Sequence, residues 1–166
     1  MNKIIMSICL AACISFSSCK KDEFNGVSTS HAPIPVTVSN LFGIYNGVPT
    51  VSASVSGGGA LTISLSIPAG TGRSIKEITK VGVATTPSNF KVVQIATGLY
   101  NTAPIPGSGT SVTFTTSLAE FTAKTGIAVT ASGTATSFLS RYFMFLVTLD
   151  NGDIIYPVGV RIYVAS

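Results

Sequence analysis

The chain has 166 residues, of which 46% are hydrophobic and only 10% are charged, and its formal net charge at pH 7 is +4. The hydrophobic content excludes an intrinsically disordered chain, and the length suits one domain that needs neither metals nor disulfides for stability. Beyond residue 23, seven Lys and Arg residues stand against four Asp and Glu residues. They form no basic stripe with interleaved aromatics, so we expect no nucleic-acid partner. The β-branched, hydroxyl-rich composition with frequent Gly and Pro predicts a small all-β protein.

Residues 1–18 have the three parts of a secretory signal peptide. Lys3 precedes an almost wholly apolar run, Ile4–Phe16, and the small residues Ser17 and Ser18 follow it. As a helix this run would be about 20 Å long, which is shorter than the ~30 Å hydrocarbon core of a bilayer. We therefore expect an export signal and not a membrane-spanning anchor.

The residues around Cys19 resemble a lipoprotein signal. Phe16-Ser17-Ser18-Cys19 is similar to a lipobox, in which small residues precede an invariant Cys, although Leu is more usual where Phe16 stands. The following Lys20-Lys21-Asp22-Glu23 resembles the charged segment of Bacteroidota-type surface-exposed lipoproteins. This resemblance covers about the first 23 residues. It implies cleavage before Cys19, a lipid on Cys19, and a protein anchored to the outer membrane and exposed at the cell surface.

The cysteine positions agree with this expectation. Cys9 and Cys13 lie inside the apolar run and would leave with it, so no intramolecular disulfide can form in the mature chain. The alternative is an ordinary secretory signal with cleavage elsewhere, which would leave a free thiol. We expect residues 19–35 to be the acylated Cys and a flexible tether, which contains the only histidine, His31, and no second metal ligand beside it.

The remaining residues, 36–166, alternate between apolar and polar positions over several runs. We expect residues 51–56 and 61–67 to pair as a β-hairpin around three glycines, with an apolar inner face and a hydroxyl outer face. The sequence predicts further strands at 35–41, 78–85, 91–97, 110–116 and 127–131, and two long strands at 139–149 and 154–164.

The two long strands carry the clearest local signals. An Asn-Gly pair, Asn151-Gly152, separates them, which is typical of a hairpin turn. Both faces of 139–149 are apolar, so this strand should be central and covered on both sides. Pro157 lacks an N–H group and therefore predicts a bulge or an edge position in the last strand.

One segment predicts a helix. Ser117-Leu118-Ala119-Glu120 is a capping box, Lys124 suits a last turn and Gly126 suits a helix end, so we expect one short helix at 118–124 that crosses between two sheets. Ser74–Glu77 has the same spacing but leads into a strand pattern. Seven to nine short strands with one crossover helix fit a single immunoglobulin-like β-sandwich without the Cys–Trp–Cys core of antibody domains.

Catalytic groupings are scarce in residues 36–166. No serine has a histidine available and no G-x-S-x-G occurs, so acyl-transfer chemistry is not expected. We expect each acidic residue of this segment to have a structural and not a catalytic role. The turn at 150–153 has no downstream Glu to complete a Ca²⁺ loop. We expect a non-catalytic protein with no cofactor and no metal site.

Aromatic residues are the remaining candidates for ligand binding, and Phe90, Tyr100 and Tyr163 are the ones selected. Tyr100 lies in a loop beside Pro and Gly, and Tyr163 alternates outward with Arg161 if Val160 and Ile162 face inward. Two function classes stay open. One is an accessory glycan-binding module of a polysaccharide-uptake system, and the other is a structural, interaction or adhesin-type subunit that packs against another envelope protein.

The lipoprotein expectation has a direct test. Mass spectrometry of the mature N-terminus should find Cys19 as the first residue and should find it acylated, with more than one acyl chain because a single chain anchors only weakly. An unmodified N-terminus at any other residue would refute both the anchor and the surface localisation that depends on it.

Overall fold

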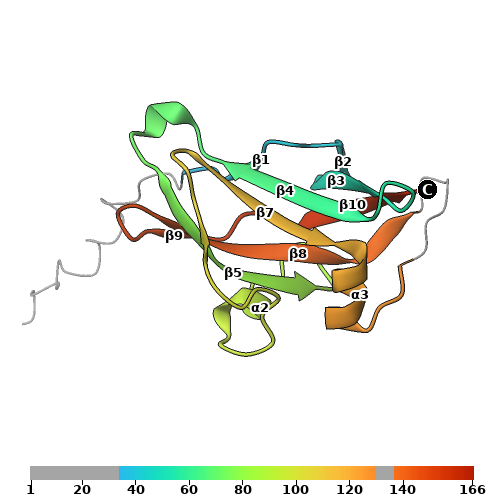
Figure 1. Ribbon diagram of the computed structural model, residues 1–166. Coiled ribbons are helices and arrows are strands. Elements are labelled where there is room, and N and C mark those ends of the chain that lie inside the picture. The colour runs from blue at the N-terminus through green and yellow to red at the C-terminus, as the bar shows by residue number, and fades with distance from the viewer. Residues whose placement is uncertain (1–33, 130–136) are drawn as a thin grey trace, which may run out of the picture. The chain divides into compact units, whose positions relative to one another are not determined.

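Two β-sheets packed against each other form the framework of the computed structural model, which describes residues 34–129 and 137–166 (Figure 1). The smaller sheet has three strands in the order β1-β4-β7, and the larger has the order β2-β3-β10-β8-β5-β6, with β9 paired to β8. The strands are β1 Thr37–Val38, β2 Gly43–Tyr45, β3 Val48–Ser54, β4 Ala60–Ser66, β5 Ile75–Ala84, β6 Ile105–Pro106, β7 Ser111–Ser117, β8 Phe138–Leu149, β9 Ile154–Ile155 and β10 Val160–Ala165.

The strand order is that of an immunoglobulin-like sandwich. When β4, β5, β7, β8 and β10 are read as strands B, C, E, F and G, B pairs with E in one sheet and F lies between C and G in the other. Strand β3 extends the second sheet by pairing parallel to β10, whereas the other pairings of the large sheet are antiparallel. The expected all-β sandwich with a short helix is confirmed.

Strand β8 is the central strand, as its two apolar faces predict. It lies between β10 and β5. Phe143, Phe145 and Val147 are fully buried in the core between the two sheets. On the opposite face of β8, Met144 and Leu146 are also buried, in a second cluster that includes Val93. Both faces of the large sheet are therefore covered along this part of β8.

The expected hairpin of residues 51–56 and 61–67 is wrong. Strand β3 pairs with β2 and β10, whereas β4 pairs with β1 and β7, so the two strands belong to different sheets. The intervening turn, in which Gly58 and Gly59 have positive φ, carries the chain across the sandwich. Val51 of β3 and Ile63 of β4 are buried in the same core. Alternation places apolar residues on an inner face, but it does not distinguish two strands that pair from two strands that face each other.

The expected strand at 91–97 is also wrong, because residues Lys91–Gln94 form the short helix α2. This helix packs directly on Gly82 of β5. A Cβ atom at that glycine would lie 2.9 Å from Cγ2 of Val92 and 3.1 Å from Cγ1 of Val93. The close approach buries Val93 completely, so tertiary packing overrides the strand propensity of the two valines.

Other boundaries differ more modestly. The expected strand 154–164 is two strands, β9 and β10, with Pro157 between them, as the missing N–H of proline explains. The expected strand 35–41 is reduced to β1, and residues 127–129 are not in a strand; the rest of the strand expected at 127–131 lies outside the described residues. A turn of 3-10 helix, η2 (Ala69–Thr71), precedes β5, which starts at Ile75 and so confirms the strand expected after Ser74.

The predicted crossover helix is confirmed as α3, Leu118–Thr125 (Figure 1). The Ser117 hydroxyl accepts a hydrogen bond from the backbone N–H of Glu120 at 3.1 Å, and Gly126 ends the helix with a φ of 71°. Phe121 is fully buried in the core. The helix follows β7 of the small sheet and precedes β8 of the large sheet in the chain.

A substitution at Phe143 tests the arrangement of the core. Its ring contacts the rings of Tyr100, Phe114 and Phe121 at centroid distances of 5.2, 5.5 and 5.9 Å. The variant Phe143→Ala should lower the free energy of unfolding by about 3–5 kcal/mol, measured by urea denaturation. Phe42→Ala, which removes a half-exposed ring, is the matched control and should cost about 1 kcal/mol or less. Equal losses in the two variants would contradict the arrangement of the core.

Candidate functional site

The outer face of the large sheet carries a row of aromatic side chains. In β10, Val160, Ile162 and Val164 are buried in the core, so Arg161 and Tyr163 lie on the opposite face. The pairing of β10 with β8 places Tyr142 beside Arg161 and Phe138 beside Tyr163. The expectation that Arg161 and Tyr163 alternate outward is confirmed.

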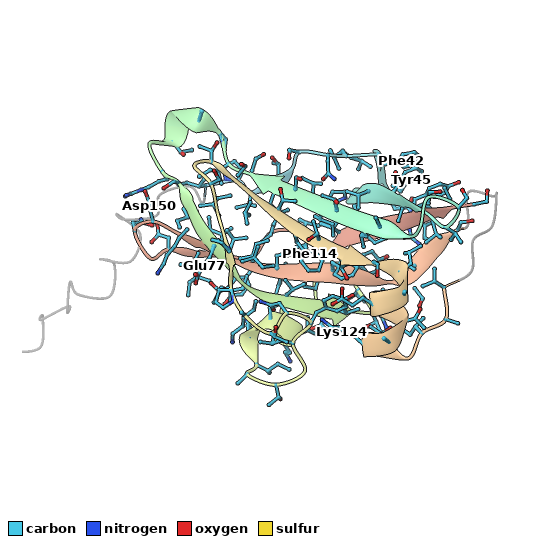
Figure 2. All side chains as sticks on the ribbon, viewed as in Figure 1. Phe42, Tyr45, Glu77, Phe114, Lys124 and Asp150 are labelled. Atoms are coloured by element: carbon cyan, nitrogen blue, oxygen red, sulfur yellow. The ribbon has the colours of Figure 1, made fainter. Side chains whose placement is uncertain are left out.

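Two more rings come from edge strand β2, which ends at Tyr45, and from the residue before it, Phe42. Phe42 stacks on Tyr163 with ring centroids 5.0 Å apart and on Tyr45 with centroids 6.3 Å apart. Tyr45 and Tyr163 each meet Phe138 edge to face, at 5.1 and 5.6 Å. These four rings therefore form a closed cycle of contacts. Figure 2 shows Phe42 and Tyr45 beside β2 and β3, at one end of the sheet. The aromatic face is defined here as Phe42, Tyr45, Phe138, Tyr142, Arg161 and Tyr163.

A tight turn fixes the place of the β2 segment. Asn46 and Gly47 both have positive φ, 53° and 76°, which is the backbone of a two-residue hairpin turn between β2 and β3. The turn pairs Tyr45 with Val48. The backbone N–H of Phe42 donates to the carbonyl oxygen of Thr50 at 2.8 Å. Asn46-Gly47 is a hairpin-turn signal of the same type as Asn151-Gly152. From Asn46-Gly47 one could have predicted a strand containing Tyr45, and with it the place of Phe42 and Tyr45 beside β3.

Arg161 is the charged member of the aromatic face. Its guanidinium carbon lies 4.0 Å from the ring centroid of Phe138 and 5.8 Å from that of Tyr142, both within the range of cation–π attraction. Its Nε atom is buried and has no hydrogen-bond partner among the described residues. The one salt bridge within residues 34–129 and 137–166 joins Lys124 to Glu120, so Arg161 has no carboxylate partner there.

The aromatic face combines apolar carbon with unpaired hydroxyl groups. Phe42 is 50% exposed and Tyr45 is 37% exposed. The hydroxyls of Tyr45, Tyr142 and Tyr163 make no hydrogen bond to any part of the chain that the structure describes. Exposed Ser52 is the cross-strand partner of Tyr163 and adds another hydroxyl. The face therefore offers aromatic hydrocarbon and neutral hydrogen-bonding groups side by side.

The three residues selected from the sequence do not form one platform. Tyr163 belongs to the aromatic face, whereas Phe90 is half-buried in the cluster over β8, with its ring 6.0 Å from that of Tyr156. Tyr100 is only 5% exposed, so the expectation of an exposed loop ring is wrong at this position. Cys19, expected to carry the lipid, lies outside the described residues.

Tyr100 is a core residue with one polar contact. Its ring packs against Phe114 and Phe143, and its hydroxyl lies 2.8 Å from the hydroxyl of Thr116. The Lys124 ammonium lies 4.4 Å from the centre of the ring and donates to the Tyr100 carbonyl oxygen at 2.7 Å. Burial raises the pKa of Tyr100 above its ordinary value of 10.0.

A hollow of about 240 Å³ beside α3 is a weaker candidate for a site. Its lining includes Tyr100, Lys124 and Arg141. The Lys124 ammonium already contacts the carboxylate of Glu120 at 2.7 Å. That contact and the hydroxyl of Thr116 lower the pKa of Glu120. Of the two cations that line the hollow, Lys124 is thus paired with a carboxylate, and Arg141 donates to the backbone carbonyl oxygen of Ser140 at 3.0 Å.

The other acidic side chains make local hydrogen bonds. Glu77 accepts from the Thr79 hydroxyl at 3.1 Å, Asp150 from the Ser74 hydroxyl at 3.2 Å, and Asp153 from the Asn151 amide at 2.7 Å. No group of three or more His, Cys, Asp or Glu residues in the described part of the chain is arranged to hold a metal ion. Within the same residues, no helix has the length and apolar character needed to cross a membrane.

Comparisons with known proteins do not place this chain in a family. No protein-family model matches the chain, and no curated protein or solved structure matches it significantly.

The buried phenol of Tyr100 gives a pH-dependent prediction. Because the pKa of Tyr100 is higher in the folded chain than in the unfolded chain, its protonated form favours folding below about pH 10, and this contribution is lost as the pH rises through the folded-state value. Thermal unfolding followed between pH 8 and 11 should show a loss of stability that is smaller in Tyr100→Phe. Identical pH profiles for the wild type and Tyr100→Phe would contradict the assignment.

Proposed function

We propose that this protein is a non-catalytic, lipid-anchored surface protein that binds glycan chains on its aromatic face. The observation that carries the proposal is the combination, on one sheet surface, of partly exposed aromatic rings with tyrosine hydroxyls that have no hydrogen-bond partner among the described residues. Sugars present apolar C–H faces and rings of hydroxyl groups, so they suit a surface that has both kinds of group.

The rings of the aromatic face lie close together on the outer surface of the large sheet. They come from β8, from β10, from β2 and from the residue before β2. The ring centroids of Phe42, Tyr45, Phe138 and Tyr163 lie 5.0–6.3 Å apart around the cycle, so the rings form one compact cluster. A compact aromatic cluster on a sheet surface suits contact with part of a longer sugar chain.

The expected position of the protein in the cell agrees with such a role. The lipobox resemblance at Phe16–Cys19 implies an anchor at the outer membrane, and a tether that ends near Pro35 would hold the sandwich away from the lipid surface. A surface-anchored binding module concentrates polysaccharide where transport proteins need it. We therefore propose an accessory role in polysaccharide uptake.

Calorimetric titration of the purified full chain against a panel of polysaccharides tests the proposal. The double variant Phe42→Ala/Tyr163→Ala should weaken binding at least about tenfold, equivalent to about 1.4 kcal/mol. Ile154→Ala removes an exposed apolar side chain from strand β9 and is the control that should leave affinity unchanged. Absence of binding to every polysaccharide, or equal binding by the double variant, would refute the glycan site.

An interaction subunit is the second candidate, and one observation favours it. Leu41 and Ile44, beside the aromatic face, are 45% and 67% exposed, and β2 is an edge strand of the large sheet. Exposed apolar residues at a sheet edge suit pairing with another envelope protein. If the panel gives no binding and Ile44→Lys abolishes co-purification of an envelope protein from the native membrane, this candidate replaces the first.

A further inference from the structure

The aromatic face contains a cation that nothing in the described part of the chain neutralises. The Nε atom of Arg161 is buried without a hydrogen-bond partner, and no carboxylate lies within salt-bridge distance of the guanidinium. Burying a donor of a charged group without a partner is unfavourable, because the water that it loses is not replaced. The stacking on Phe138 offsets part of this cost and also holds the planar group in one orientation.

The acidic residues of the sheet lie far from this cation. Strands β2, β3, β8 and β10 contain no Asp or Glu. Along β8, Tyr142 lies beside Arg161, whereas Asp150 follows the far end of the strand, about 26 Å away at about 3.3 Å per residue. Figure 2 shows Asp150 and Glu77 at the end of the sandwich opposite Phe42 and Tyr45. These four strands therefore place no Asp or Glu side chain beside Arg161.

A guanidinium that is held by stacking and has no carboxylate partner among the described residues suits a planar anion. Arginine binds a carboxylate through two parallel N–H···O bonds, and such charge-assisted pairs are stronger than hydrogen bonds between neutral groups. The rings around Arg161 place this interaction beside surfaces suited to sugar C–H groups. Among glycans, the chemistry that combines a sugar ring with a carboxylate is that of a uronic acid.

We infer that the aromatic face selects acidic polysaccharides and that Arg161 binds the carboxylate of a uronic-acid unit. This inference rests on the proposed glycan-binding function and adds the chemical class of the ligand. The orientation of Arg161 comes from Phe138 and Tyr142, so these two rings act as positioning residues for the guanidinium.

Polygalacturonate and its fully methyl-esterified form are the probes, because they share one backbone and differ in charge. Affinity of the full chain is measured by calorimetry for both. Polygalacturonate should bind at least about tenfold more tightly than the ester, and Arg161→Gln should remove this difference. Arg161→Lys keeps the charge but loses the bidentate geometry, and it should retain only part of the preference.

Arg141→Gln is the matched control, because it removes the same charge from β8 at a position that lines the hollow beside α3. It should keep the wild-type preference for polygalacturonate. A preference that falls equally in Arg141→Gln and Arg161→Gln would reflect general attraction between charges and would overturn the inference. Dextran sulfate against dextran distinguishes sulfate from carboxylate: an Arg161-dependent preference only in that pair would also overturn it.

The outcomes separate this inference from the proposed function. Equal binding of the two galacturonate probes, with loss in Phe42→Ala/Tyr163→Ala, would keep the glycan site and refute its selectivity for acidic chains. Absence of binding to both probes and to every neutral polysaccharide would refute the glycan site itself, and the inference with it.

Discussion

The burial of β8 on both faces is the constraint on which the rest of the structure depends. A strand that is apolar on both faces needs a layer on each side. The small sheet covers one face, where Phe143 and Phe145 reach the core, and the segment containing α2 covers the other, where Met144 and Leu146 are buried. The segment containing α2 covers only part of the outer surface of the large sheet. The aromatic face occupies the part of this surface that the segment leaves uncovered. Tyr142 belongs to both regions, because it packs against the second cluster and also lies beside Arg161.

The features that were predictable from the sequence are those set by local chemistry. The central place of β8 follows from its composition, α3 from its capping box, and the turn at Asn151-Gly152 from the tolerance of these residues for unusual backbone angles. Which strands pair with each other was harder to predict from the sequence. The alternation of apolar and polar residues in β3 and β4 fits two paired strands and also fits two strands that face each other across a core. The helix at 91–94 depends on contact with Gly82, a residue distant in sequence, and no local signal encodes such a contact.

The candidate site was predictable only in part, and for a similar reason. Tyr163 was identified from alternation within a single strand. Tyr100 was selected because it lies in a loop, yet its ring enters the core and contacts Phe114 and Phe143. Phe42 and Tyr45 were not selected, although Asn46-Gly47 marks the turn that brings them over the sheet. Both Tyr100 and Phe42 have the sequence neighbours that are typical of a loop. Long-range packing therefore decides that Tyr100 is buried and Phe42 is exposed.

The construction of the aromatic face has a consequence for how the proposed ligand would bind. Its rings lie on strands or beside a tight turn and are packed against one another, so little conformational freedom is lost when a ligand binds. A site on the open surface of a sheet encloses less of each sugar than a pocket does, so the affinity of a single molecule for one site should be modest. On the proposed membrane-anchored protein, many copies on one membrane would compensate for this, because a long polysaccharide would contact several of them and the effective concentration of the second site would be high. The proposed arrangement would therefore retain long chains at a surface and release short ones.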